Sequence, residues 1–562
     1  MKLASSLNTQ KNIAYFSMEI AIDKTIPTYS GGLGILAGDT IRSAADLAVP
    51  MVAVTLLYKK GYLRQVLDQD GHQKELPEEW DPSAHIKLLP HKISVTIENR
   101  KIHVQAWEYI ITGINNYSVP VILLDTDIEQ NSPDDRQLTY YLYGGDQQYR
   151  LAQEIILGIG GVRMLNTLGY TTIDRYHMNE GHSSLLTLEL LKETNKDPEK
   201  WDHDRVKRKC VFTTHTPVPA GMDQFPYDLV GRMLGQYIPV DRLKQLCCQD
   251  SLNMTLLALT FSHYENGVAK SHRSVAQHMF PGYRIDSITN GVHSGTWVCE
   301  EFARLYDKYI AGWRNDPFSL RYALNIPEDE VMAAHVNAKR RLFEYIKNKI
   351  NIDLAPNVFT IGFARRATGY KRADLIFYDM ERLINITREH GPIQLIFAGK
   401  AHPADYSGKD LIKKIIDTAN KYQDKLKIVY LENYDFTLAG MLVSGVDCWL
   451  NTPQKPREAS GTSGMKAAHN GVPSFSILDG WWIEGCIEGY TGWAIGSLSA
   501  DESNDRDDAY SLYEKLERVI LPGFYQNGKD WVNIMRHSIA INAAFFNTHR
   551  MLLQYVLNAY LE

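Results

Sequence analysis

Apolar and polar residues alternate regularly in two separate regions of this 562-residue chain, and each region predicts a series of strands and helices. Residues 12–18 and 51–58 are apolar enough to be buried strands. A glycine turn at 30–34 and an amphipathic run over 35–48 lie between them. A strand, a helix and a second strand in this order predict a β-α-β unit with parallel strands and a right-handed crossover.

The stretch from 93 to 125 has a different pattern. Apolar and polar residues alternate strictly in I-S-V-T-I and I-H-V-Q-A-W, on either side of the turn E-N-R-K. This alternation is typical of an antiparallel hairpin, which we expect to be an insertion at one edge of the first domain. Helical periodicity returns over 149–168, and residues 211–214 predict a further short strand.

A second β-α alternation begins near residue 357. Its expected strands are 358–363, 393–397, 427–431, 447–450 and 474–478, and helical or polar stretches separate them. At about 150 residues per domain, the length allows two to four domains. We therefore expect an α/β fold of two Rossmann-like domains, 1–310 and 311–538. A last helix over 539–562 would pack on either domain, possibly back on the N-terminal one.

Composition narrows the class of protein. Apolar residues make up 44% of the chain and charged residues 22%, which is ordinary globular usage and excludes a disordered or fibrous protein. The net charge is −6 and no arm is rich in Lys or Arg, so a nucleic-acid binder is not expected. The apolar runs are too short to cross a bilayer, and no signal-peptide pattern opens the chain. A cytoplasmic protein without a membrane partner is the expectation.

Cationic and polar residues follow four successive strands of the second region. Because ligands bind beyond the carboxyl ends of parallel strands, these residues are expected to line one site. Several cations in one place indicate an anionic ligand, for which phosphate is the best fit. A set of solvated loops is the alternative. In chain order the residues are Arg365, Arg366, Lys371, Lys400, Tyr434, Glu458 and Lys466.

The glycine turn at 30–34 offers backbone N–H groups at the start of a helix, where the helix dipole favours an oxyanion. It also fits a dinucleotide fingerprint, but the next strand lacks the acidic residue that would hold a ribose. The loop at Lys400 is not a P-loop, because Gln394 and Ala401 stand where that motif needs glycine and Ser/Thr. His177, Glu180 and His182 match no zinc signature, and the six cysteines form no C-x-x-C pair, so no metal is expected.

The segment E-A-S-G-T-S-G-M-K, residues 458–466, carries the most specific signal. Its small residues leave backbone N–H groups free for an anion or for sugar hydroxyls. A lysine held among small and apolar residues has its amine pKa pushed down, which favours Schiff-base chemistry at Lys466. From the residues alone, a phosphate-binding loop with an ordinary lysine stays equally open.

This segment closely resembles the α-glucan phosphorylases, in which the usual run is E-A-S-G-T-G-N-M-K and its lysine carries pyridoxal phosphate. Ser463 and Gly464 replace Gly-Asn here, as in the shorter bacterial and archaeal members. Thr368 replaces a histidine of the usual pattern. Further matches occur in order along the chain: S-G-G-L-G at 30–34, T-T-H-T at 213–216, T-N-G-V at 289–292, A-R-R-A-T-G-Y-K-R at 364–372, A-G-K-A at 398–401 and L-E-N-Y at 431–434.

The resemblance implies a GT-B fold whose two domains face a central catalytic cleft. It implies retaining phosphorolysis of α-1,4-glucan or maltodextrin by inorganic phosphate, with pyridoxal 5′-phosphate as cofactor. The catalytic residues would be Arg366, Lys371, His215 and Glu458. The cofactor would be bound by Lys466, Arg365, Thr462, Ser463, Gly464, Tyr434, Trp297 and Lys400. The substrates would be bound by Gly32, Leu33, Asn290, Ala459, Ser460, Gly461, Glu180 and His182.

Two other functions compete with this interpretation. A nucleotide-sugar glycosyltransferase of the same fold, such as a bacterial glycogen synthase, shares Arg366, Lys371 and Glu458, but it does not share Lys466 in its glycine-rich run. A non-catalytic glucan-binding protein is the second alternative, and the intact cationic group argues against it. The matching region starts near residue 12, so the N-terminal regulatory extension of long family members is not expected. A homo-oligomer is compatible with the sequence.

Overall fold

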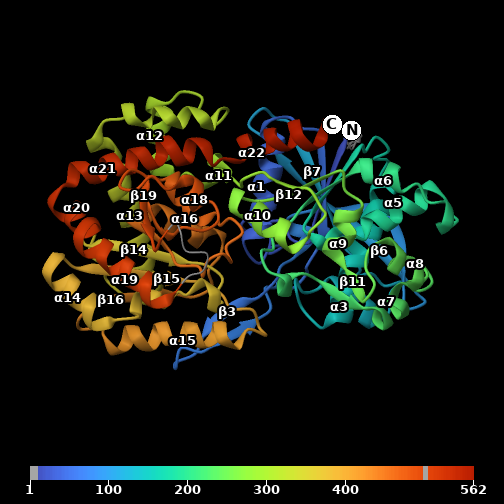
Figure 1. Ribbon diagram of the computed structural model, residues 1–562, viewed down its shortest axis with the longest axis horizontal. Coiled ribbons are helices and arrows are strands. Elements are labelled where there is room, and N and C mark those ends of the chain that lie inside the picture. The colour runs from blue at the N-terminus through green and yellow to red at the C-terminus, as the bar shows by residue number, and fades with distance from the viewer. Residues whose placement is uncertain (1–10, 498–503, 562) are drawn as a thin grey trace.

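The computed structural model describes residues 11–497 and 504–561, which form two lobes that lie side by side (Figure 1). Each lobe contains one large β-sheet with helices packed around it. The predicted α/β class with parallel sheets is confirmed. Within the described ranges, no helix combines the length and the apolar composition that crossing a bilayer requires.

The sheet of the first lobe has nine strands in the order β13-β12-β9-β8-β1-β2-β7-β6-β5. Strand β1 is buried on both faces, because Ala14 and Phe16 point into one apolar cluster and Ile13 and Tyr15 into another. The strands are β1 (Ile13–Ser17), β2 (Met51–Leu56), β5 (Lys87–Ile97), β6 (Arg100–Thr112), β7 (Ser118–Asp125), β8 (Arg175–Asn179), β9 (Cys210–Thr213), β12 (Tyr264–Gly267) and β13 (Ile285–Ser287).

Strands β5 and β6 form the antiparallel edge of this sheet and correspond to the alternating stretch. Their turn residues Glu98 and Asn99 both have positive φ, as a two-residue type I′ hairpin requires. β7 pairs antiparallel with β6 but parallel with β2, so the hairpin extends the main sheet. The lobe's helices are α1 (Gly32–Asp46), α2 (Pro133–Arg136), α3 (Gln147–Ile155), α4 (Gly161–Thr167), α5 (Leu186–Thr194), α6 (His203–Lys209), α7 (Tyr227–Leu234), α8 (Val240–Leu246), α9 (Met254–Thr260), α10 (Lys270–Met279) and α11 (Ser294–Trp297).

The second lobe has a six-stranded, fully parallel sheet in the order β16-β15-β14-β17-β18-β19. Its strands are β14 (Phe359–Ala364), β15 (Ile393–Ala398), β16 (Lys427–Leu431), β17 (Cys448–Asn451), β18 (Ser474–Ile477) and β19 (Gly492–Ile495). Its helices are α12 (Glu300–Tyr309), α13 (Glu328–Ile350), α14 (Met380–His390), α15 (Tyr406–Lys421), α16 (Phe436–Gly445), α17 (Ser463–Ala468), α18 (Trp482–Gly485), α19 (Asp505–Lys515), α20 (Leu521–Gln526) and α21 (Gly528–His537). Its main core contains buried residues from Val298 to Ala544.

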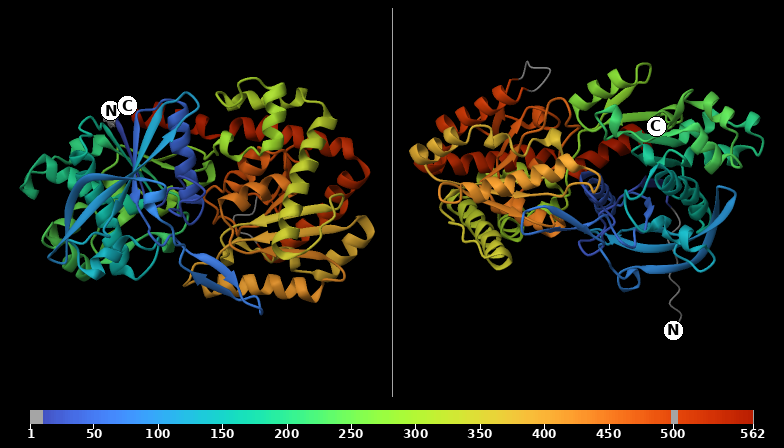
Figure 2. Two further views of the ribbon diagram at one scale, coloured as in Figure 1. Left: turned by 180° about the vertical axis from the view of Figure 1, so that it is seen from behind. Right: turned by 90° about the horizontal axis from the view of Figure 1, so that it is seen from below.

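A β-hairpin arm joins the lobes. Strands β3 (Arg64–Leu67) and β4 (Gln73–Leu76) leave the first lobe and lie beside α15 of the second (Figures 1 and 2). Gln73 makes two hydrogen bonds with the backbone of Ala401, and Lys409 of α15 pairs with Glu75. The arm of the first lobe therefore contacts residues that lie just beyond the strand ends of the second sheet.

The helix expected over 539–562 is interrupted. A helical turn at Ser538–Ala543 packs in the second lobe, the helical conformation ends at Phe545, and α22 (Thr548–Tyr555) then lies on α1 of the first lobe. Asn547 causes the break because its side chain caps α22, accepting the Arg550 backbone N–H. The chain therefore crosses between the lobes a second time here.

Candidate functional site

The order of the strands reverses once in each sheet, between β1 and β8 in the first lobe and between β14 and β17 in the second. Ligands of parallel sheets bind at such points, beyond the carboxyl ends of the strands. Glu19 and Glu180 follow β1 and β8, and Arg365, Arg366 and Glu458 follow β14 and β17. The two points meet at the junction of the lobes.

Glu458 is the centre of a buried charged group. Its Oε2 lies 2.6 Å from an Arg365 guanidinium nitrogen and 2.5 Å from Lys371 Nζ. Burial acts to raise the pKa of Glu458, but Arg365 and Lys371 outweigh it and hold the pKa at about 2. The other terminal nitrogen of Arg365, Nη1, is buried without a hydrogen-bond partner. Two cations share one carboxylate, so the group keeps a net positive charge and can accept an anion.

Arg366 extends from the second lobe to the glycine loop of the first. Its guanidinium nitrogen lies 3.5 Å from Ser30 Oγ. Glu19 holds this loop, because its carboxylate accepts the backbone N–H groups of Ser30 (2.5 Å) and Gly31 (3.1 Å). The loop then leads directly into α1, where Gly32 and Leu33 occupy the first turn. The structure thus brings a cation and the exposed start of a helix together.

Lys466 lies on α17 at the same junction and is 7% exposed. Its Nζ is 3.9 Å from the centre of the Trp297 ring. Burial lowers the pKa of the Lys466 amine to about 8, and nearby Asp39 partly opposes this effect. Roughly a tenth of the amine is therefore unprotonated at pH 7, far more than for an ordinary lysine, and the unprotonated form is the one that attacks a carbonyl carbon.

The rest of the segment 458–466 is packed closely. A Cβ on Gly464 would lie 2.7 Å from both Ser474 Oγ and Trp481 Cζ2, so only glycine fits there. Ser463 Oγ accepts the indole N–H of Trp449 at 3.0 Å. Thr462 precedes α17, and Ala459, Ser460 and Gly461 continue from Glu458; Gly461 has a φ of +75°.

His215 lies on the first-lobe side and is uncharged at neutral pH. Its ring nitrogen Nε2 is 2.7 Å from Asn179 Oδ1, and burial together with nearby histidines lowers its pKa to about 3. Glu180 accepts the His215 backbone N–H at 2.8 Å and the Thr216 hydroxyl at 2.8 Å. Glu180 therefore fixes the conformation of the loop that carries His215. Close by, the Nε2 atom of His182 lies 3.1 Å from a carboxylate oxygen of Asp223.

The remaining predicted residues have different environments. Asn290 is 4% exposed, and its side-chain oxygen is buried without a hydrogen-bond partner. Lys400 Nζ donates to the Leu63 carbonyl at 3.0 Å, so it ties the second lobe to the hairpin arm. Burial raises the pKa of Tyr434, which keeps its hydroxyl protonated.

Sequence reasoning missed three buried carboxylates near this junction, Glu19, Asp39 and Asp479. Asp479 accepts the backbone N–H groups of Glu458 (2.9 Å) and Gly480 (2.8 Å), and burial raises its pKa to about 6. Glu19 and Asp479 follow β1 and β18, so the rule applied to the other strand ends would have identified both. Asp39 lies inside α1, where no local pattern marks it.

Comparisons with known proteins place these features in a wider context. The family model described as carbohydrate phosphorylase matches residues 239–489. The chain is 41% identical to the maltodextrin phosphorylase of Thermococcus litoralis, over 97% of this chain and 70% of that protein. It is 35% identical to the glycogen phosphorylase of Aquifex aeolicus, over 98% of this chain and 86% of that protein. An uncharacterized protein of Methanocaldococcus jannaschii is 32% identical, over 98% of this chain and all of that protein.

Proposed function

The chain belongs to the carbohydrate phosphorylase family, and on that premise we propose that it cleaves α-1,4-glucans with inorganic phosphate and releases α-glucose 1-phosphate. The resemblance identified from the motifs is confirmed at the level of the family. The proposal includes a GT-B fold whose two domains, expected at 1–310 and 311–538, correspond to the two lobes, with α12 (Glu300–Tyr309) packed in the second lobe. In it α22 (Thr548–Tyr555) returns to the first domain.

One observation supports this function above the others: a buried lysine with an easily deprotonated amine lies at the same junction as a cationic group. Lys466 suits a covalent link to an aldehyde, and Arg365, Arg366 and Lys371 suit phosphate groups. A nucleotide-sugar transferase needs the cations but has no use for such a lysine.

The residues present fit pyridoxal 5′-phosphate. Lys466 would hold its aldehyde carbon, and the unpartnered Nη1 of Arg365 would be satisfied by a phosphate oxygen. Gly464, two residues before Lys466, lets Ser474 and Trp481 pack directly against the backbone of α17. The chemistry that this cofactor supplies when bound is proton exchange through its 5′-phosphate.

The protein's own side chains position the substrates. Arg366 and Lys371 would hold the inorganic phosphate and offset its repulsion from a second phosphate group. His215 is neutral, so it would accept or donate hydrogen bonds to the glucosyl unit without acting as a charged acid. The side-chain oxygen of Asn290, which has no hydrogen-bond partner in the protein, would accept a hydrogen bond from a sugar hydroxyl.

A direct assay tests the reaction. Maltodextrin and inorganic phosphate are incubated with the purified protein, and glucose 1-phosphate release is followed. The expected result is release that depends on phosphate, with chain extension when glucose 1-phosphate is supplied instead. Activity that requires UDP-glucose or ADP-glucose and ignores phosphate would contradict the proposal and favour the glycosyltransferase.

The cofactor is tested separately. Borohydride reduction followed by peptide mapping should find a pyridoxyl adduct on Lys466. Lys466→Ala should lose the cofactor and nearly all activity, and Lys466→Arg, which keeps a cation of similar length, should lose them too. An adduct on a different lysine, or none, would remove Lys466 from its assigned role.

A further inference from the structure

Helix α1 presents Gly32, Asp39 and Asp46 at intervals of seven residues. Seven residues make about two turns of an α-helix, so these three positions lie on one face. Gly32 begins the helix at the glycine loop. Asp39 and Asp46 are buried, at 1% and 6% exposure, and a buried carboxylate must find partners to offset its loss of hydration. The hydrogen-bond partners of Asp39 and Asp46 indicate the role of this face of α1.

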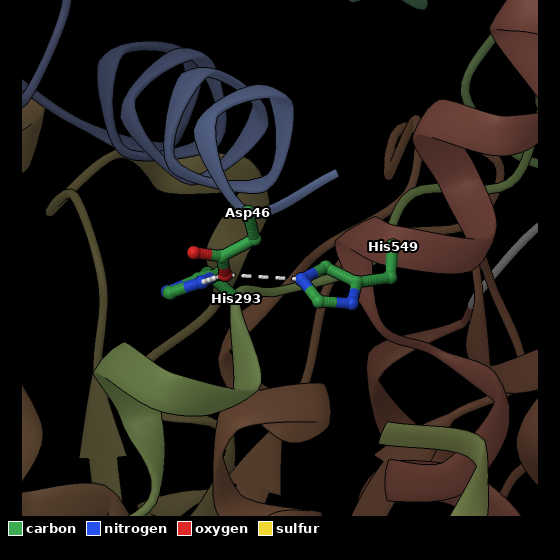
Figure 3. A group of neighbouring side chains, drawn as sticks. All are labelled: Asp46, His293 and His549. Atoms are coloured by element: carbon green, nitrogen blue, oxygen red, sulfur yellow. Dashed lines mark hydrogen bonds and ion pairs between the residues drawn. The ribbon is translucent and has the colours of Figure 1, made fainter. Parts of the chain in front are cut away.

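Asp46 holds the C-terminal helix against α1 (Figure 3). Its Oδ2 accepts hydrogen bonds from Nε2 of His293 (2.8 Å) and Nε2 of His549 (3.1 Å). Its Oδ1 accepts the Ile114 backbone N–H at 2.9 Å. Both carboxylate oxygens are therefore satisfied by protein donors. We interpret Asp46, His293 and His549 as a cluster that holds α22 against α1 and also fixes the loop containing His293.

Asp39 contacts the predicted cofactor site through Trp297. Its Oδ2 accepts the indole N–H of Trp297 at 2.7 Å and the backbone N–H of His293 at 3.2 Å. The Trp297 ring lies under Lys466 Nζ, 3.9 Å from the amine. A charged-group hydrogen bond to the indole fixes the ring plane, and the ring in turn packs against the amine.

The charges around Lys466 single out Asp39. Among the residues that the structure describes, Asp39 is the charged side chain that acts on the Lys466 pKa, which burial lowers and Asp39 raises. His469, one turn further along α17, is neutral above about pH 4 because burial lowers its pKa, and its Nε2 is 2.9 Å from Ser294 Oγ. The Lys466 amine thus has one opposite charge to balance it.

We propose that Asp39 is a positioning residue of the cofactor site, which holds the Trp297 indole against Lys466 and places a carboxylate that counters the charge of its amine. This inference rests on the proposed function for the identity of the cofactor. Helix α1 then serves both the substrate and the cofactor: its first turn would face the substrate phosphate, and Asp39, at the end of its second turn, faces the side of the cofactor lysine. The contact joins α1 of the first lobe to α17 of the second.

The test measures the protonation of Lys466 itself. The full chain, freed of cofactor by cysteine treatment and dialysis, is labelled with trace acetic anhydride at a series of pH values. Peptide mass spectrometry then gives the midpoint for Lys466. The wild-type midpoint is expected near 8. Asp39→Asn should lower it by about one pH unit, because an opposite charge is lost, and Asp39→Glu should restore it.

Asp46→Asn is the matched control, since it removes a second buried carboxylate from the same face of α1. It should loosen α22 but leave the Lys466 midpoint unchanged. Asp39→Ser, which also removes the charge, replaces Asp39→Asn if that variant does not fold. An unmoved midpoint in the neutral Asp39 variants, or an equal fall in Asp46→Asn, would overturn the proposal. Absence of any cofactor in the purified chain would instead contradict the proposed function.

Discussion

The guanidinium of Arg366 lies 3.5 Å from the hydroxyl oxygen of Ser30, so a cation of the second lobe reaches the glycine loop of the first. The other two cations of its group, Arg365 and Lys371, are paired with Glu458. Arg366 is also exposed, whereas Lys371 is buried. An incoming phosphate would therefore meet Arg366 first and compete with Glu458 for the others.

Arg366→Ala should lower kcat/KM for phosphorolysis by roughly 10²–10³ while the cofactor stays bound. The reason is the loss of a fixed cation that stabilises two adjacent phosphate groups in the transition state. Lys371→Ala should have an effect of similar size. Glucose 1-phosphate release measures the rate, and cofactor absorbance measures occupancy. Arg388→Ala, which removes an exposed cation from α14, is the control. Near-normal rates in both site variants would remove the assigned roles.

Gln73→Ala should destabilise the contact between the lobes. The Gln73 side chain both donates to the Ala401 carbonyl (2.9 Å) and accepts the Ala401 N–H (2.9 Å). Its removal leaves two buried backbone groups unpaired, at a cost of about 1–3 kcal/mol each. Urea unfolding should show the loss, and limited proteolysis should cut the β3–β4 arm faster. Lys74→Ala, an exposed neighbour on β4, should behave as wild type; equal stability in the two variants would contradict this role for Gln73.

Local pattern predicted β1, β2, β9 and β14 to β18 because these strands are largely buried and read as apolar runs, and it predicted the β5–β6 hairpin from its alternation. It missed the short strands β8, β12, β13 and β19. It did not predict the arm. The residues of β3 and β4, R-Q-V-L and Q-K-E-L, are largely polar, because the arm is stabilised by hydrogen bonds to the other lobe and not by a core of its own. Without knowledge of the second lobe's surface, the sequence of such a segment predicts a loop.

The candidate site shows the same contrast between residues that local pattern predicts and contacts that it does not. Arg365, Arg366 and Glu458 could be found because each follows a strand, and strand ends meet at one edge of a sheet. Their pairing could not, because Lys371 and Glu458 are 87 residues apart and the loop conformation decides the contact. Asp39 was missed because its partner Trp297 is 258 residues away. Side-chain contacts over such separations depend on the packing of the lobes.

Gly464→Ala should destabilise the protein and weaken cofactor binding. The added methyl group would lie 2.7 Å from Ser474 Oγ and 2.7 Å from Trp481 Cζ2, closer than atoms can pack, and such overpacking costs about 1–3 kcal/mol. Thermal unfolding and cofactor content would measure both effects.

Gly440→Ala provides the matched control for that substitution. Gly440 lies inside α16, and a Cβ there meets no atom within 4 Å. Because alanine favours the helix, this variant should gain about 0.5–1 kcal/mol. If the two alanine variants lose the same stability, the close packing around Gly464 is not what excludes a side chain.

Glu458→Gln should destabilise the ligand-free protein at neutral pH, and phosphate should restore part of the loss. The pKa of Glu458 is about 2 in the folded state against a usual 4.5, so the ionised carboxylate stabilises the fold above about pH 4.5. That contribution is lost as the pH falls from 4.5 toward 2. The shift corresponds to about 3 kcal/mol, which the neutral amide would forgo at pH 7.

The measurement is urea unfolding of both proteins at pH 7 and at pH values down to the acid limit of folding, with and without phosphate. The difference between them should shrink as the pH falls below 4.5, since the wild-type carboxyl then also becomes neutral. Phosphate should stabilise the variant more than the wild type, because the anion replaces the missing charge between Arg365 and Lys371. Glu389→Gln, at an exposed position on α14, controls for a general charge effect. A pH-independent difference would show that Glu458 contributes through packing and not through its charge.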